Sequence, residues 1–217
     1  RLDGGYGQSD TRRAYIDSSC GTICDFATKG RSQRADLTGH AALPGDFTLD
    51  FGGDSEWTRF ETTFDLEQKA RLSSGHALFG FHRDGLDLSA GVRFDDHSRF
   101  GGHWTFGANG SVHVAENWRL RASYGEGFKA PTLVQLYGFG GNVALRPERS
   151  KAYDLGIEMG SRGTGLHFAL TGFLRQTQDL IVAPPPTYDN FNIGKARAAG
   201  FEVELGADVT DRLRAQA

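Results

Sequence analysis

The chain has 217 residues, a formal net charge of -3 and 38% hydrophobic residues, enough apolar material for a sizeable core. Its 30 glycines lack a three-residue period, which excludes collagen, and its 16 Phe argue against disorder. The charge gives no reason to expect a nucleic-acid partner. No apolar run approaches the ~20 residues of a membrane helix. Hydropathy alone therefore indicates a soluble protein, although a transmembrane β-barrel also averages out as hydrophilic.

Alternating apolar and polar residues predict a long series of β-strands. The clearest strand covers 86–95, where Leu88 and Val92 share an apolar face and Ser89 and Arg93 share a polar one. In chain order, alternation covers 35–43, 47–51, 86–95, 104–114, 118–124, 153–159, 166–174 and 201–207, and it is weaker over 75–81. We expect about eleven strands, many near the ~9 to 11 residues that cross a bilayer at a tilt.

The connections between these strands alternate in length. Short segments rich in turn-forming residues lie at 44–46, 83–85, 116–117, 161–164 and 208–212. Longer segments lie between them, at 10–30, 53–69, 96–102, 126–149 and 177–191. This pattern predicts an up-and-down antiparallel sheet with short turns at one end and long loops at the other, as in outer-membrane barrels.

Two soluble folds compete with this interpretation. A β-sandwich also alternates, but its strands are usually shorter. A soluble barrel would turn its apolar face inward around a ligand. An outward apolar face is favoured because the other face is rich in charged residues and because aromatic residues fall near the expected strand ends, as in interfacial girdles. These aromatic residues are Phe94, Trp104, Trp118, Tyr124 and Tyr153.

Four motifs occur in a fixed order: RFDDHSRFGG (93–102), ASYGEGFKAPTLVQLYG (122–138), GNVALRPERSKAYDLGIE (141–158) and NIGKARAAGFEVEL (192–205). Together they resemble the barrel of TonB-dependent outer-membrane receptors, most closely the cobalamin-receptor branch. Val143 stands where that family usually has Pro. The resemblance implies an all-β, antiparallel, up-and-down transmembrane β-barrel. Residues 1–217 would be part of a barrel of about 22 strands, with no plug domain visible.

The same resemblance implies a transporter and not an enzyme. It places the protein in the outer membrane of a Gram-negative bacterium, in contact with lipid, a small-molecule nutrient and, through the absent plug, the TonB complex. Cobalamin is the first expectation for the nutrient, and a ferric siderophore or haem is the second. A passive porin-like barrel remains a further alternative.

Most motif residues have an expected architectural role. Pro131 biases the chain out of its strand and allows a helical turn to begin. Leu145 is expected to anchor a loop, and Pro147 and Glu148 to direct the chain into the next strand. Five residues in this long loop are candidates for substrate contact: Phe128, Lys129, Tyr137, Phe139 and Asn142.

Asp95, Asp96 and His97 invite a catalytic or metal-binding interpretation, but the strand is expected to end at Asp95 and a loop to begin at Asp96. Charged residues are ordinary at such a position. No Gly-x-Ser-x-Gly motif supports a hydrolase, and no glycine-rich segment has the Lys-Ser/Thr ending of a phosphate loop. We therefore expect no catalytic residues and no cofactor.

Cys20 and Cys24 fall in the first long connection and are candidates for a disulfide, because such a loop would face an oxidising exterior. A zinc site would need further ligands at usable spacing. Asp17, Asp25 and Asp54 could contribute to calcium binding by extracellular loops, although their spacing is not that of a dense acidic site.

Overall fold

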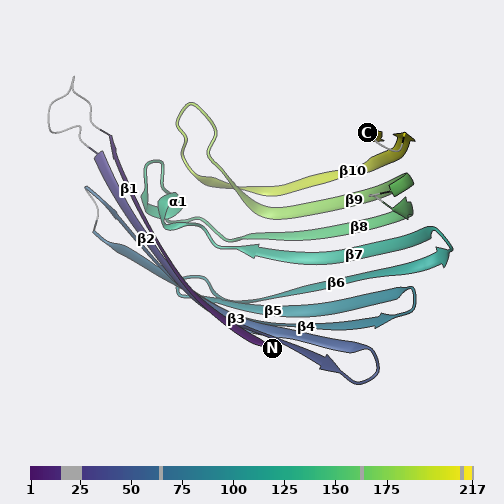
Figure 1. Cartoon of the computed structure of the whole chain (residues 1–217). Coiled ribbons are helices and arrows are strands. Elements are labelled where there is room, and N and C mark those ends of the chain that lie inside the picture. Colours follow the sequence, from purple (N-terminus) through teal and green to yellow (C-terminus); the bar gives the residue numbers. More distant parts are fainter. Residues whose placement is uncertain (16–25, 64–65, 162–163, 211–212, 217) are drawn as a thin grey trace.

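The computed structural model describes residues 1–15, 26–63, 66–161, 164–210 and 213–216 (Figure 1). It contains one antiparallel sheet of 11 strands, in which each strand pairs with its neighbours in the chain. The strands are β1 (Leu2–Tyr15), β2 (Phe26–Leu43), β3 (Phe47–Thr62), β4 (Gln68–Arg83), β5 (Leu86–His97), β6 (Gly101–Ala115), β7 (Trp118–Lys129), β8 (Glu148–Ser161), β9 (Thr164–Val182), β10 (Phe191–Thr210) and β11 (Leu213–Gln216). The predicted all-β meander is confirmed.

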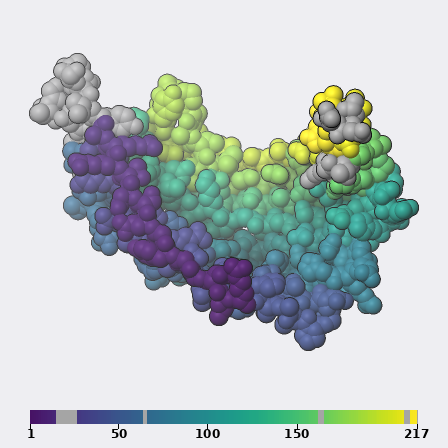
Figure 2. Space-filling view, in the orientation of Figure 1, coloured from purple at the N-terminus to yellow at the C-terminus, as the bar shows by residue number. Residues whose placement is uncertain are grey.

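The sheet is bent into a trough (Figures 1 and 2). We call its two sides the outward face, which carries Leu88, and the concave face, which carries Ser89. The register keeps the two sets apart, because Leu88 lies opposite Phe81 of β4 and Gly110 of β6. Large apolar side chains remain exposed on the outward face, including Leu155 (67%) and Phe201 (75%). So much exposed apolar surface is unusual for a monomer in water.

The strands are longer than their sequence pattern predicts. β1 to β10 have 12 to 20 residues each, against the ~9 to 11 expected. Two connections predicted to be long are therefore short, covering only 63–67 and 98–100. The prediction failed because backbone pairing continues beyond the apolar band, where both faces carry polar residues and the alternation disappears.

The three short turns that the structure describes in full, between β2 and β3, β4 and β5, and β6 and β7, fall where they were predicted. Asp84 and Gly85 join β4 to β5, and Gly85 has a φ of +75°, a conformation that glycine adopts without strain. The turn between β2 and β3 similarly places Gly45 and Asp46 at positive φ. These turns gather at one end of the trough, and the β7–β8 and β9–β10 connections gather at the other (Figure 1).

One helical segment, α1 (Leu133–Tyr137), interrupts the β7–β8 connection, as the motif around Pro131 predicts. Thr132 caps it: the backbone N–H of Gln135 donates to the Thr132 hydroxyl, and the Gln135 side chain accepts from the Thr132 backbone. Leu133 and Leu136 are buried, and α1 contacts β3 and β4. In the described part of the chain, no helix has the length and apolar character needed to span a membrane.

Candidate functional site

A hollow of about 890 Å³ opens on the concave face, beside α1 and at the end of the trough that carries the longer connections. Residues from β1 to β7 and from the start of the β7–β8 connection line it. Part of the lining is apolar or aromatic: Phe60, Leu72, Phe128, Leu133, Val134 and Phe139. Apolar side chains with a few polar groups among them are typical of a site that binds a small molecule.

The charged groups of this hollow are mostly held by partners. Arg93 donates to Asp54 (3.2 Å) and to Asp95 (2.8 Å). The Ser74 hydroxyl also donates to Asp95, at 2.7 Å. Arg13, in contrast, has no ion-pair partner among the described residues. The arrangement suits noncovalent binding, because none of these contacts prepares a nucleophile or an acid–base pair.

Three of the five candidate contact residues line the hollow: Phe128, Lys129 and Phe139. Phe139 is 79% exposed, so its ring is available for contact. Phe128 stacks on His103, with 4.1 Å between the ring centroids. Lys129 forms a 3.0 Å ion pair with Glu148, which lies at the start of β8.

The other two candidates are held by contacts within the loops. Arg99 donates to the Tyr137 hydroxyl and, at 2.7 Å, to the Val143 carbonyl. The Asn142 side chain donates to the Asn190 carbonyl (3.0 Å) and accepts from the Ala144 backbone (2.9 Å). Neither Tyr137 nor Asn142 lines the hollow. The sequence gave no sign that Arg99 holds this loop, because its partners Tyr137 and Val143 lie 38 and 44 residues further along the chain.

The LRPE segment (145–148) holds the β7–β8 loop in place. Leu145 is 3% exposed, which agrees with the expected loop anchor. Arg146 forms a 2.6 Å ion pair with Asp179, and its backbone N–H donates to the Asn192 side chain at 2.8 Å. The loop between β7 and β8 is thereby fixed to the ends of β9 and β10.

The Asp95–Asp96–His97 run does not converge on one site. All three residues belong to β5, so the expectation that a loop begins at Asp96 is wrong; pairing with β6 continues through His97 and Gly101. Asp95 and His97 line the hollow, whereas Asp96 lies 3.8 Å from Arg71. Across the described ranges, no group of three or more His, Cys, Asp or Glu residues could hold a metal ion.

The predicted disulfide between Cys20 and Cys24 lies outside the described residues, as do Asp17 and Asp25. Asp54, the third residue considered for calcium, was expected in a loop but lies in β3. Its carboxylate is 8% exposed and faces Arg93 at 3.2 Å and Arg34 at 3.5 Å. Those arginines occupy the carboxylate, so Asp54 is not a free loop ligand.

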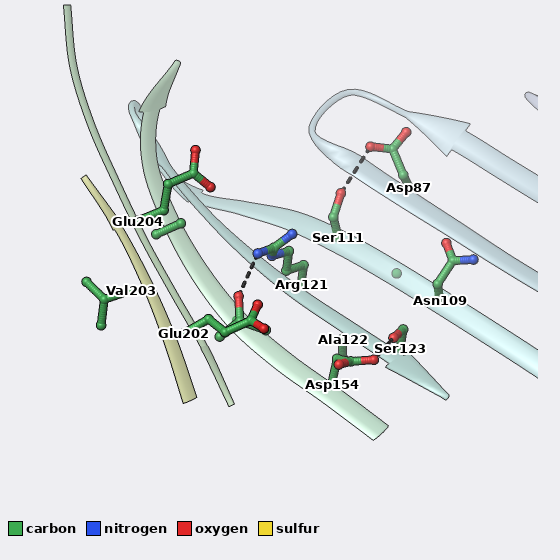
Figure 3. Close-up of a pocket in the computed structure, with 14 residues that line it drawn as sticks. Asp87, Asn109, Ser111, Arg121, Ala122, Ser123, Asp154, Glu202, Val203 and Glu204 are labelled. Carbon is green, nitrogen blue, oxygen red and sulfur yellow. Dashed lines mark hydrogen bonds between the residues drawn. The ribbon is translucent and has the colours of Figure 1, made fainter. Parts of the chain in front are cut away.

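A second hollow of about 660 Å³ lies further along the concave face (Figure 3). Its polar side chains contact one another across strands: Ser111 of β6 donates to Asp87 of β5 at 3.2 Å, and Arg121 of β7 reaches past β8 and donates to Thr171 of β9 at 2.6 Å. Glu202 and Glu204 of β10 also line it. The concave face is therefore polar well away from α1, as predicted for a wet interior.

Comparison with known proteins places the chain in a family. Residues 1–216 match the family model described as TonB dependent receptor-like, beta-barrel. A mutant of the ferric enterobactin receptor from Pseudomonas aeruginosa, in complex with enterobactin, aligns with a TM-score of 0.80 at 21% identity, over 98% of this chain and 40% of that chain. The siderophore receptor PirA from Pseudomonas aeruginosa aligns with a TM-score of 0.75 at 24% identity, over 97% of this chain and 46% of that chain.

The FrpB iron transporter from Neisseria meningitidis (F5-1 variant) aligns with a TM-score of 0.79 at 14% identity, over 99% of this chain and 40% of that chain. The chain spans less than half the length of each of these structures. At these identities the alignments establish the fold, and the match to the family model covers almost every residue. The chain belongs to the TonB-dependent receptor-like β-barrel family.

Proposed function

We propose that this chain forms about half of the wall of an outer-membrane receptor that imports a large, scarce nutrient with energy supplied through TonB. The observation that carries the proposal is the opposition of its two faces: exposed Leu155 and Phe201 outside, paired Arg93 and Asp95 inside. Lipid would cover the outward face. The TonB complex would act through a plug domain filling the concave side, in the outer membrane of a Gram-negative bacterium.

For the nutrient, we propose a ferric siderophore. The three matched structures named above are receptors or transporters of enterobactin, siderophores or iron by their own descriptions. The aromatic and apolar lining of the 890 Å³ hollow, together with Arg13, suits a bulky ligand with anionic groups. Cobalamin, expected from the order of the motifs, has no counterpart among these structures and remains a competing prediction, as does haem.

A titration of the full-length receptor separates these substrates. Purified receptor is mixed with a ferric catecholate siderophore, cyanocobalamin or haem, and quenching of tryptophan fluorescence is followed. We expect saturable binding of the ferric siderophore alone. Binding of cyanocobalamin alone would overturn the siderophore assignment, and binding of none of the three would favour a passive barrel.

Within the hollow, we propose that Phe128, Lys129 and Phe139 contact the substrate, and that Tyr137 and Asn142 position the loop that carries them. Phe139→Ala should weaken binding about tenfold, the size of effect expected for an exposed aromatic anchor. Tyr188→Ala is the matched control, because Tyr188 is an exposed aromatic residue of the neighbouring connection that does not line the hollow. Equal affinity of the two variants would remove Phe139 from the site.

A further inference from the structure

Four basic side chains cluster on the outward face near the long-connection ends of β8 and β10. They are Arg149, Lys151, Lys195 and Arg197, and we call them the basic patch. Lys151 and Arg197 share one cross-strand row, and Arg149 and Lys195 share the next, with a glutamine of β9 between the two cations in each row. From ordinary strand geometry, the cations lie about 10 Å apart across the rows and about 7 Å apart along a strand.

The patch carries more positive charge than its neighbours neutralise. Lys151 forms a 3.2 Å ion pair with Glu126, and Arg149 approaches the His103 ring at 3.4 Å. Lys195 and Arg197 are exposed and have no ion-pair partner in the described part of the chain.

The corresponding ends of β2 to β4 also carry basic residues, but these residues have carboxylate partners. These basic residues, which we call the paired rim, are Lys29, Arg31, Arg59, Lys69 and Arg71. Each lies within 4 Å of a carboxylate; Arg31 is 2.6 Å from Asp10, and Lys69 is 2.8 Å from Glu67. The hydrogen bond from Lys69 lowers the pKa of Glu67, so that carboxyl stays ionised. Excess positive charge is therefore a property of the β8–β10 patch and not of the whole rim.

The patch also borders the apolar band directly. The next outward residues toward the short turns are Tyr153 and Leu155 on β8, and Ala199 and Phe201 on β10. If the outward face lies in lipid, as the proposed function requires, this border coincides with the headgroups of the extracellular leaflet. Arginine and lysine at such a depth attract anionic headgroups, and arginine matches phosphate through paired hydrogen bonds.

We propose that the basic patch binds the phosphate groups of a lipid in the extracellular leaflet. The two cations of β10 supply uncompensated charge, those of β8 extend the site, and the exposed amides of Gln176 and Gln178 can donate further hydrogen bonds to phosphate oxygens. Bound lipid would cover this part of the wall beside the connections that carry the candidate substrate site.

The test uses the full-length receptor in detergent, with diphosphorylated lipid A as the probe and native mass spectrometry to measure occupancy. Lys195→Gln/Arg197→Gln should weaken lipid binding about twenty-five-fold, or about fivefold for each charge removed. Lys69→Gln/Arg71→Gln removes the same charge from the paired rim, at two positions that do not line the hollow, and should change binding by less than about twofold. Equal losses in the two double variants, or no loss in the first, would overturn the proposal.

Two further arms identify the source of the phosphate. Dephosphorylated lipid A should bind no better to the native receptor than to the Lys195→Gln/Arg197→Gln variant. Millimolar inorganic phosphate should displace little lipid; complete displacement would show a free-phosphate site and overturn the assignment to a headgroup. Siderophore binding, measured on the same preparations, should be unchanged in both variants, so failure of the substrate proposal is seen separately from failure of the patch.

Discussion

Two residues of β5, seven positions apart, lie in opposite surroundings. Leu88, on the outward face, is 46% exposed among other apolar side chains. Asp95, on the concave face, is 5% exposed and receives hydrogen bonds from Arg93 and Ser74. In a protein surrounded by water, burial would run the other way. The outward face is therefore built for an apolar solvent and the concave face for a polar interior.

The largest expected effect comes from placing a charge on the outward face. In the full-length receptor, Leu88→Lys should lower the free energy of unfolding from bilayers by ~2 to 4 kcal/mol, the cost of lysine on the lipid face near midplane. Ser89→Lys, one residue along, should cost less than about 1 kcal/mol because it faces the wet side. Urea titration of receptor folded into lipid vesicles measures both, and a larger loss from Ser89→Lys would mean that the faces are reversed.

A smaller effect is expected in the apolar cluster beside α1, on the concave face. Leu136 is 2% exposed, and Leu136→Ala should cost about 2 to 3 kcal/mol of local stability through the lost contacts and the cavity. Hydrogen exchange should accelerate in α1 while the strands keep their protection. Val134→Ala, at a position 54% exposed in the same helix, is the control and should leave exchange nearly unchanged.

The polar contacts of the concave face should contribute less to the free energy of unfolding than the apolar cluster beside α1 does. Asp95→Asn removes the charge beside Arg93, which keeps its 3.2 Å contact with Asp54. We expect a loss of about 1 to 2 kcal/mol, because the amide still accepts one hydrogen bond. Denaturant unfolding provides the measurement. A gain in stability would show that Asp95 is a cost imposed by function and not a stabilising partner.

The smallest effect belongs to the paired rim. Arg31→Gln breaks the exposed 2.6 Å ion pair with Asp10 and should change the free energy of unfolding less than Asp95→Asn does, since exposed pairs are screened by water and salt. Raising the salt concentration should reduce even that difference. A loss as large as that of Asp95→Asn would mean that the rim holds the strands together.

The sequence predicts the strands well wherever one face is apolar. The strand at 86–95 was found because Leu88 and Val92 alternate with Ser89 and Arg93. The helical turn of α1 was found because Pro131 biases the chain out of its strand. The ends of the strands were missed at Asp96 and His97. There, pairing with β6 continues although neither face is apolar.

The candidate site was less predictable, because long-range register decides which side chains meet. Tyr137 was named as a substrate contact because it lies in the long loop, and its sequence neighbourhood gave no sign that Arg99, 38 residues earlier, donates a hydrogen bond to its hydroxyl. Phe60 and Leu72 break the polar pattern of the concave face, and their place in the hollow follows only from the way α1 folds back onto β3 and β4. No local pattern contains that information.

Scanning β5 with a spin label shows whether lipid covers the outward face and water the concave face. Single cysteines from Leu86 to Asp95 are labelled in the full-length receptor, with Cys20 and Cys24 replaced by Ser, in lipid bilayers. Oxygen accessibility should peak at Leu88, Ala90 and Val92, and accessibility to a water-soluble nickel complex at Ser89, Gly91 and Arg93. The opposite phase, or no two-residue period, would contradict this account.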